Sequence, residues 1–402
     1  MKRRYMYVLA LIVVGVVFLL TSPLLDSNEI NDNKEEIGKP SEAKMEENQN
    51  REWIIAWEGK YDPAIEEQST ILTWDEKQKV TLVMVNPDID QAIWSEKWKM
   101  AQGVRYIQPN YTYKVKSMPT DSFILKQTYL KQIGAYEGWD VRNSNTGIVI
   151  AIIDTGVDLN HPDLRNNLVG GINLVPKEGE KVEDAEKRPP QDDNGHGTQV
   201  AGILAAEGNN GIGVSGILWK AKVMPIKAMD ANGDGKDYIV GRGIYEAVDR
   251  GAKIILLSLG DPIYSIYMKE AVDYAEVNGV LVVAATGNDY DRVNYPAAFP
   301  TVIAVGAVNT DDLYMSYSNS GPEVSVMAPG EGIYTTTLNG EYSVESGTSM
   351  AAPQVAGLAA LILAKYPDMK PAQVRDFIAQ STVDVGAKGW DNKTGFGRIS
   401  IS

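Results

Sequence analysis

After Met118, apolar residues are concentrated in short runs that are separated by amphipathic stretches. The runs are Ile148–Ile153, Val223–Ile226, Ile254–Leu259, Val280–Ala285 and Val302–Val305. The stretches with helical spacing include Gln199–Ala206, Val240–Arg250 and Tyr267–Val277. Apolar runs without alternation, separated by helices, are typical of parallel strands covered on both faces. We therefore predict a doubly wound, mostly parallel α/β domain over residues 119–402, with its site at the carboxyl ends of the strands.

Residues 51–118 have another pattern, in which short apolar runs alternate with polar stretches. This pattern predicts two strands, an amphipathic helix and a last strand region interrupted at a proline. In chain order these elements are Trp53–Trp57, Val80–Val85, Asp90–Ala101 and Val104–Val115. Strands mixed with a helix in so short a segment indicate a small α+β domain.

The first 25 residues indicate export. Lys2, Arg3 and Arg4 precede the apolar run Val8–Leu20, a pattern typical of a secretory signal. That run is short for a membrane span, yet no small-residue cleavage site follows it. A cleaved signal peptide and an anchor retained through residues 5–25 therefore both stay open. We expect the protein to be extracellular, either secreted or held at the outer face of the membrane.

Residues 26–50 are rich in acidic side chains and contain no aromatic residue, so they are predicted to be a disordered spacer. The whole chain has 38 Lys and Arg against 53 Asp and Glu, a net charge of −15, which argues against nucleic acid as a partner. The absence of cysteine excludes disulfide scaffolds, thiolate metal sites and cysteine nucleophiles. Only His161 and His196 are present, which also excludes histidine-rich metal sites.

Three segments contain residues suited to nucleophilic catalysis. Asp154 ends a predicted buried strand, His196 stands between two glycines at a predicted helix start, and Ser349 lies in the first turn of a long apolar helix. A serine hydroxyl needs a neighbouring base, an imidazole is such a base near neutral pH, and a buried carboxylate fixes its tautomer. Taken singly, these residues would be a turn Asp, a loop His and a helix cap. Their conjunction favours catalysis.

At these residues the chain resembles the subtilisin-like serine proteases, particularly the thermitase-like branch, over residues 119–402. The order Asp, His, Ser is that of subtilisin. The resemblance implies that Asp154 orients, His196 is the base and Ser349 is the nucleophile. It also implies that Asn288, which ends Val282-Val-Ala-Ala-Thr-Gly-Asn288, donates a hydrogen bond to the oxyanion.

The resemblance further implies an extended substrate peptide that pairs with two segments of the chain. These segments contribute Ser258, Leu259 and Gly260, and Gly233 and Gly235. Asn294 would form the floor of the pocket for the residue preceding the cut, which implies broad specificity with a preference for apolar residues. The family commonly has His where this chain has Gln199 and Gln354. Neither position belongs to the triad.

A structural calcium ion is also expected from the resemblance, because a set of oxygen ligands separated in sequence matches the family's strong calcium site. The set comprises the side chains of Asp121, Asp163 and Asn210 and the carbonyls of Gly208, Ile212 and Val214. Solvated turn residues are the alternative. Asp230–Gly235 matches the first half of an EF-hand loop, but the twelfth position is Gly241, so we do not expect a whole EF-hand.

Residues 51–118 resemble the family's inhibitory propeptide through the pattern in Val104–Tyr113. We therefore expect a serine endopeptidase made as a self-processing precursor, with protein substrates and its own propeptide as inhibitor and folding aid. An accessory domain that stays attached is the alternative for this segment. A catalytically silent binding protein is the rival for the whole chain, and the intact catalytic residues argue against it. An α/β-hydrolase esterase would need the order Ser, Asp, His.

Overall fold

The structure is a computed structural model that describes residues 51–112 and 118–401, which form two compact units. We describe the units separately. The predicted export signal, the acidic spacer and the end of the predicted strand region Val104–Val115 lie outside the described residues.

The N-terminal unit is a four-stranded antiparallel sheet in the order β2-β3-β1-β4, with α1 packed on one face. Its elements are β1 (Glu52–Trp57), η1 (Pro63–Glu67), β2 (Ser69–Asp75), β3 (Val80–Val85), α1 (Gln91–Lys99) and β4 (Val104–Pro109). Trp53 and Trp57 of β1 pack edge-to-face on Trp94 and Trp98 of α1, with both pairs of ring centroids 5.9 Å apart. The unit thus has an aromatic core of its own.

The sequence pattern did not predict β2, and its place in the sheet explains why. It is an edge strand whose side chains are mostly exposed, and a register irregularity between Ile71 and Thr73 interrupts its pairing with β3. The hydrophobic alternation that identifies a half-buried strand is therefore weak here.

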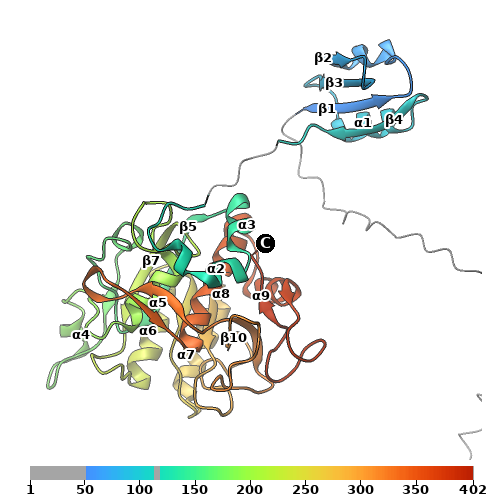
Figure 1. The fold of residues 1–402 in the computed structure, drawn as a ribbon. Coiled ribbons are helices and arrows are strands. Elements are labelled where there is room, and N and C mark those ends of the chain that lie inside the picture. The colour runs from blue at the N-terminus through green and yellow to red at the C-terminus, as the bar shows by residue number, and fades with distance from the viewer. Residues whose placement is uncertain (1–50, 113–117, 402) are drawn as a thin grey trace, which may run out of the picture. The chain divides into compact units, whose positions relative to one another are not determined.

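The C-terminal unit, coloured from teal to red in Figure 1, is built on a nine-stranded sheet. The strand order is β14-β15-β11-β10-β9-β8-β5-β7-β6, and neighbouring strands are parallel except β14 and β15. Its strands are β5 (Ser144–Asp154), β6 (Ile172–Asn173), β7 (Lys220–Lys227), β8 (Ala252–Leu257), β9 (Leu281–Ala285), β10 (Val302–Val308), β11 (Val324–Pro329), β14 (Thr382–Val383) and β15 (Arg398–Ile399). A separate hairpin pairs β12 (Ile333–Thr336) with β13 (Tyr342–Glu345). The predicted doubly wound α/β fold is confirmed.

Helices cover both faces of this sheet. Its helices are η2 (Ile124–Lys126), α2 (Thr128–Gln132), α3 (Ala135–Val141), η3 (Arg165–Asn167), α4 (Val182–Ala185), α5 (His196–Ala205), α6 (Asp237–Asp249), α7 (Ile266–Val277), η4 (Leu338–Gly340), α8 (Thr348–Lys365) and α9 (Pro371–Gln380). Alternate residues of one strand enter two different cores: Ile152 of β5 packs with α5 and α8, and Ile153 packs with α6 and α7. Because both faces are buried, the strands are apolar without alternation, which is what made them recognisable.

The helix α8 runs through the first of these cores. Among the described residues it is the one helix that is long and apolar enough to cross a membrane. However, 83% of this 18-residue segment is buried inside the unit. It is therefore the core helix of a globular unit. Ser349 lies in the first turn of α8. The packing of α8 on the strands therefore fixes the position of Ser349.

Candidate active site

The predicted catalytic residues meet at the carboxyl ends of the parallel strands. Asp154 is the last residue of β5 and His196 the first of α5, while Asn288 follows β9. His196, Asn288 and Ser349 line one cleft of about 370 Å³, and Asp154 lies buried behind it. The strand order places β5 between β7 and β8, so the chain reverses its direction of winding at this point, where doubly wound sheets bind their ligands.

Asp154 and His196 form the central pair. The Nδ1 atom of His196 lies 2.8 Å from Oδ1 of Asp154, whose side chain is fully buried. The same oxygen accepts from the backbone N–H of Thr155 at 2.7 Å, which fixes the carboxylate. A proton held on Nδ1 by this pairing leaves Nε2 of His196 as the basic nitrogen.

Competing effects set the pKa of His196. Burial lowers it, but the charge and hydrogen bond of Asp154, helped by the charges of Asp192 and Glu345, raise it by more. The net result is a pKa above the ordinary value of 6.5. A raised pKa makes the imidazole a stronger base toward a hydroxyl proton.

Asp192, which the sequence analysis did not single out, shapes the start of α5. Its Oδ1 accepts from the backbone N–H of Gly195 at 2.9 Å and from the hydroxyl of Thr155 at 2.8 Å. Its Oδ2 accepts from both the N–H and the hydroxyl of Thr198, at 3.0 and 2.6 Å. This buried carboxylate caps the helix that begins at His196 and ties it to the end of β5.

The glycine that follows His196 is required by close backbone packing. A Cβ atom on Gly197 would lie 2.0 Å from the carbonyl oxygen of Gly156, so no other residue fits without a backbone shift. Gly156 itself has a φ of +104°, in the region that favours glycine. The glycines of the motif therefore serve the contact between the Asp154 and His196 segments.

Ser349 and Ser258 are joined by two reciprocal hydrogen bonds. The Oγ of Ser349 donates to the carbonyl oxygen of Ser258 at 3.0 Å, and the Oγ of Ser258 donates to the carbonyl oxygen of Ser349 at 3.1 Å. No hydrogen bond joins Ser349 to His196 within the described part of the chain. Catalytic hydrogen bonds are often long in the free enzyme and tighten only in the substrate complex.

Asn288 lies beside the start of α8 with a fixed orientation. Its Oδ1 accepts from the N–H and from the hydroxyl of Thr348, at 2.9 and 3.0 Å. Its Nδ2 is therefore the group left to face the cleft. Together with the N–H of Ser349 at the start of α8, this places donors around the position where an oxyanion would form.

The predicted substrate-binding residues lie in two adjoining cavities. Five of them line the first cleft: Gly233, Ser258, Leu259, Gly260 and Asn294. Gly235 lines a second cavity of about 480 Å³, which also includes Gly233, Leu259 and Gly260. Asn294 is buried, and its Nδ2 donates to Oδ2 of Asp289 at 2.8 Å, a contact that the sequence analysis did not anticipate.

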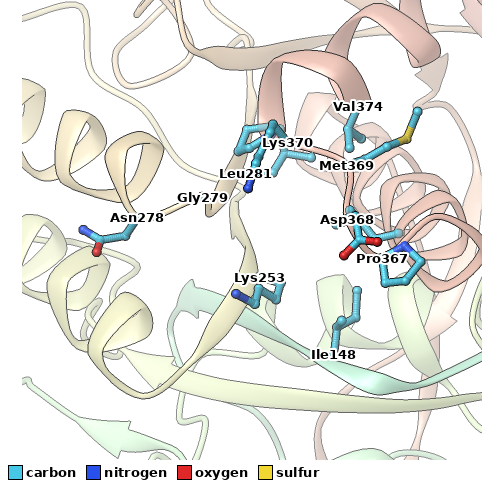
Figure 2. Close-up of a pocket in the computed structure, with 12 residues that line it drawn as sticks. Ile148, Lys253, Asn278, Gly279, Leu281, Pro367, Asp368, Met369, Lys370 and Val374 are labelled. Atoms are coloured by element: carbon cyan, nitrogen blue, oxygen red, sulfur yellow. The ribbon is translucent and has the colours of Figure 1, made fainter.

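A third cavity, of about 250 Å³, lies at the amino ends of the central strands (Figure 2). Lys253 and Leu281, near the amino ends of β8 and β9, line it together with Lys370 and Asp368 before α9. None of the candidate catalytic residues borders this cavity.

The expected cation ligands Asp121, Asp163 and Asn210 meet in a second cluster. Asp121 accepts from the backbone N–H of Asn209 at 2.8 Å and of Asn210 at 3.1 Å. Oδ1 of Asp163 accepts from Nδ2 of Asn210 at 2.7 Å. Both carboxylates are buried, which raises their pKa values, and the charge of Asp121 contributes to a pKa of about 6 for Asp163. A cation at this position would compensate the two buried negative charges of Asp121 and Asp163.

The backbone around this cluster supplies further oxygens. The carbonyls of Gly211 and Gly213 accept hydrogen bonds from the segment that contains Asp121. Those of Gly208, Ile212 and Val214 accept none from the described residues. These three are the carbonyls expected as ligands. No group of three or more His, Cys, Asp and Glu side chains that could hold a metal ion occurs among the described residues. A cation here would therefore need carbonyl and amide oxygens besides the two carboxylates, a set that suits calcium.

The two glutamines that replace family histidines make contacts of their own. The Nε2 of Gln199 donates to Oε1 of Glu345 at 2.9 Å, which connects α5 to the strand that leads into Ser349. The Nε2 of Gln354 donates to the carbonyls of Pro329 and Met350, at 2.6 and 3.0 Å. Neither glutamine contacts a residue of the expected triad within the described residues.

Comparisons with known proteins identify the family of the chain. The family model described as Subtilase family matches residues 145–397. The chain is 38% identical over 299 residues to the "Thermophilic serine proteinase" of Bacillus sp. (strain AK1), covering 74% of this chain and 71% of the relative. It is 42% identical over 248 residues to "Subtilisin E" of Bacillus subtilis (strain 168), covering 60% of this chain and 62% of the relative. With "Thermitase" of Thermoactinomyces vulgaris it shares 42% identity over 246 residues, covering 61% of this chain and 85% of the relative.

Proposed function

The chain belongs to the subtilase family of serine endopeptidases, and from this we propose that it hydrolyses protein substrates through Asp154, His196 and Ser349. The observation that carries the proposal is the buried 2.8 Å pair of Asp154 and His196 behind a cleft that also contains Ser349 and Asn288. A binding protein without catalytic activity would have no use for this combination.

In the proposed reaction, Nε2 of His196 takes the proton of the Ser349 hydroxyl as Oγ attacks the carbonyl carbon of the substrate. Asp154 holds the imidazole and stabilises its charge. The N–H of Ser349 and Nδ2 of Asn288 bind the oxyanion. The imidazolium then gives its proton to the leaving amine as the peptide bond breaks. Water, deprotonated by His196, next attacks the acyl-enzyme and releases the carboxylic acid and the free Ser349 hydroxyl.

A serine-directed sulfonyl fluoride tests the nucleophile. We expect it to label Ser349 and to stop hydrolysis of an unstructured protein. Ser349→Ala should remove both the label and the activity. Hydrolysis that persists in Ser349→Ala would refute the proposed mechanism. A folded wild-type protein that neither hydrolyses nor becomes labelled would instead favour the silent binding protein.

For specificity, we propose broad cleavage with a preference for apolar residues before the cut. The buried amide of Asn294, held by Asp289, offers a polar floor of medium size without strong selection. The adjoining cavity has apolar lining from Val240 and Met268, with Asp234 at its side. A library of peptides that vary at one position at a time would test this preference.

Residues 51–118 are proposed to be a propeptide that inhibits the catalytic unit and assists its folding. Support comes from the separate core of the N-terminal unit and from the sequence resemblance around Val104–Tyr113. Parallel sheets with distant strand pairings fold slowly, which gives such an assistant a role. An accessory domain that remains attached would show no inhibition.

A structural calcium ion is proposed to be held by Asp121, Asp163 and Asn210 with the carbonyls of Gly208, Ile212 and Val214. The free carbonyls and the buried carboxylates support this assignment.

Residues 1–25 are proposed to direct export, which would place the enzyme outside the cell. They either leave as a signal peptide or stay as a membrane tether.

A further inference from the structure

Lys227 ends β7 as a buried cation that none of the proposed catalytic steps uses. Its side chain is 5% exposed, and its register partner across the parallel strands is Asp154 at the end of β5. A lysine is rarely buried unless its ammonium group is paired and hydrogen-bonded, so its contacts need an explanation.

The ammonium group of Lys227 donates three hydrogen bonds to three different segments. One goes to the carbonyl of Thr155 at 2.7 Å, one to Oδ1 of Asp193 at 2.6 Å and one to the carbonyl of Met229 at 2.9 Å. A lysine ammonium has three donors, so this group is fully used.

Each of the three acceptors belongs to a different part of the active site. Thr155 directly follows Asp154 and donates its N–H to that carboxylate. Asp193 lies in the loop between the helix cap Asp192 and His196. Met229 lines both substrate cavities, and its own N–H donates to the carbonyl of Asp154 at 3.2 Å.

We infer that Lys227 is a positioning residue. It holds three segments in one arrangement: the end of β5 at Asp154, the loop before His196, and the segment at Met229 that lines the substrate cavities. This inference rests on the proposed function. Lys227 does not line the first cleft, so it would act through its three acceptors and not by contact with substrate. Displacement of a catalytic group by about 1 Å can lower a rate by about 10²-fold, which makes such a device consequential.

The test compares Lys227→Met with a matched variant elsewhere in the same sheet. Arg398 on β15 is also a nearly buried cation, bonded to Asp312 and to the carbonyl of Ile399, but β11, β10, β9 and β8 separate it from β5. Both Lys227→Met and Arg398→Met remove a buried charge and should lower the melting temperature. Only Lys227→Met should lower kcat per titrated active site, by tenfold to about 10²-fold.

Two further variants keep the test decisive if Lys227→Met does not fold. Lys227→Arg retains charge and donors and should recover most of the lost kcat. Asp193→Asn retains an oxygen acceptor but removes the charge that pairs with Lys227, so it should lower kcat by less than Lys227→Met does. Unchanged kcat in a folded Lys227→Met, or a loss in Lys227→Arg no smaller than in Lys227→Met, would overturn the inference. Where Lys227→Met does not fold, unchanged kcat in Asp193→Asn would overturn it. A wild-type protein without hydrolytic activity would instead overturn the proposed function.

Discussion

Asn288 and Thr348 are joined by two hydrogen bonds that both end on Oδ1 of Asn288, at 2.9 Å from the backbone N–H and 3.0 Å from the hydroxyl. Thr348 directly precedes Ser349. One contact therefore sets both the orientation of the Asn288 amide and the start of the helix that carries the nucleophile. The donor and the nucleophile cannot shift independently of each other.

We predict that Asn288→Ala lowers kcat by about 10²–10³, the scale known for loss of the corresponding donor in subtilisin, with KM nearly unchanged. Asn288→Asp should be as severe, because it keeps the acceptor for Thr348 but loses the donor. Thr348→Val, which removes only the hydroxyl contact, should be milder. Steady-state kinetics on a peptide substrate measures all three, and an Asn288→Ala enzyme with wild-type kcat would contradict the assigned role.

Ser349→Ala is expected to abolish activity and to leave the precursor uncut, because the variant lacks the hydroxyl that we propose attacks the scissile carbonyl. Intact mass of the purified variant checks this outcome. Added wild-type enzyme should cut the variant in trans, which would show that the site itself is still cleavable. If the variant matures when purified alone, processing is not self-catalysed.

The pH profile of kcat/KM should have its acid limb above 6.5. The base must be neutral, so activity is lost as the pH falls through the pKa of His196, which Asp154, Asp192 and Glu345 raise against the opposing effect of burial. Glu345→Gln removes one of these charges and should move the limb to lower pH. Asp311→Asn, on a loop outside the cleft, serves as the control and should leave the limb in place.

Chelation of divalent cations should lower the melting temperature and speed autolysis while leaving the initial rate nearly unchanged, because no triad residue belongs to the Asp121–Asp163 cluster. An ion that binds only the folded state at a hundred times its dissociation constant stabilises it by about 2.7 kcal/mol. Asp163→Asn should reduce the dependence of melting temperature on calcium. Immediate loss of catalysis with the fold intact would make the ion catalytic and the assignment wrong.

Maturation is predicted to occur between Lys114 and Thr120, where the two compact units separate. Residues 113–117 of this stretch lie outside the described residues. Sequencing the N-terminus of the mature enzyme checks the cut, and a start beyond Tyr129 would contradict it.

Residues 51–112, which contain their own core, should inhibit the mature enzyme when added as a separate chain. Absence of inhibition would favour an accessory domain.

The sequence identified the central strands and the motif residues because both leave local signals. A strand buried on both faces, such as β10, is apolar at every position. Asp154, His196 and Ser349 each stand in a short glycine-rich or strand-end motif. The exposed edge strand β2 leaves no such signal, since few of its side chains are buried.

The supporting residues could not be predicted because their roles depend on partners that are distant in sequence. In the sequence, Lys227 has the pattern of a solvated lysine at a strand end. Its place beside Asp154 and its burial become visible only in the structure. Glu345, whose charge raises the pKa of His196, accepts a hydrogen bond from Gln199, which is 146 positions away along the chain. Side-chain pairs of this kind follow from topology, which one sequence does not reveal.

The burial of α8 has a consequence for the newly made chain. The helix packs on β5, β8, β9, β10 and β11, yet it is synthesised after all of them. A nascent chain that stops before residue 348 therefore has neither the central helix of its core nor the nucleophile that this helix positions. The order of synthesis itself keeps an unfinished chain from acting as a protease, because the step that completes the core also completes the active site.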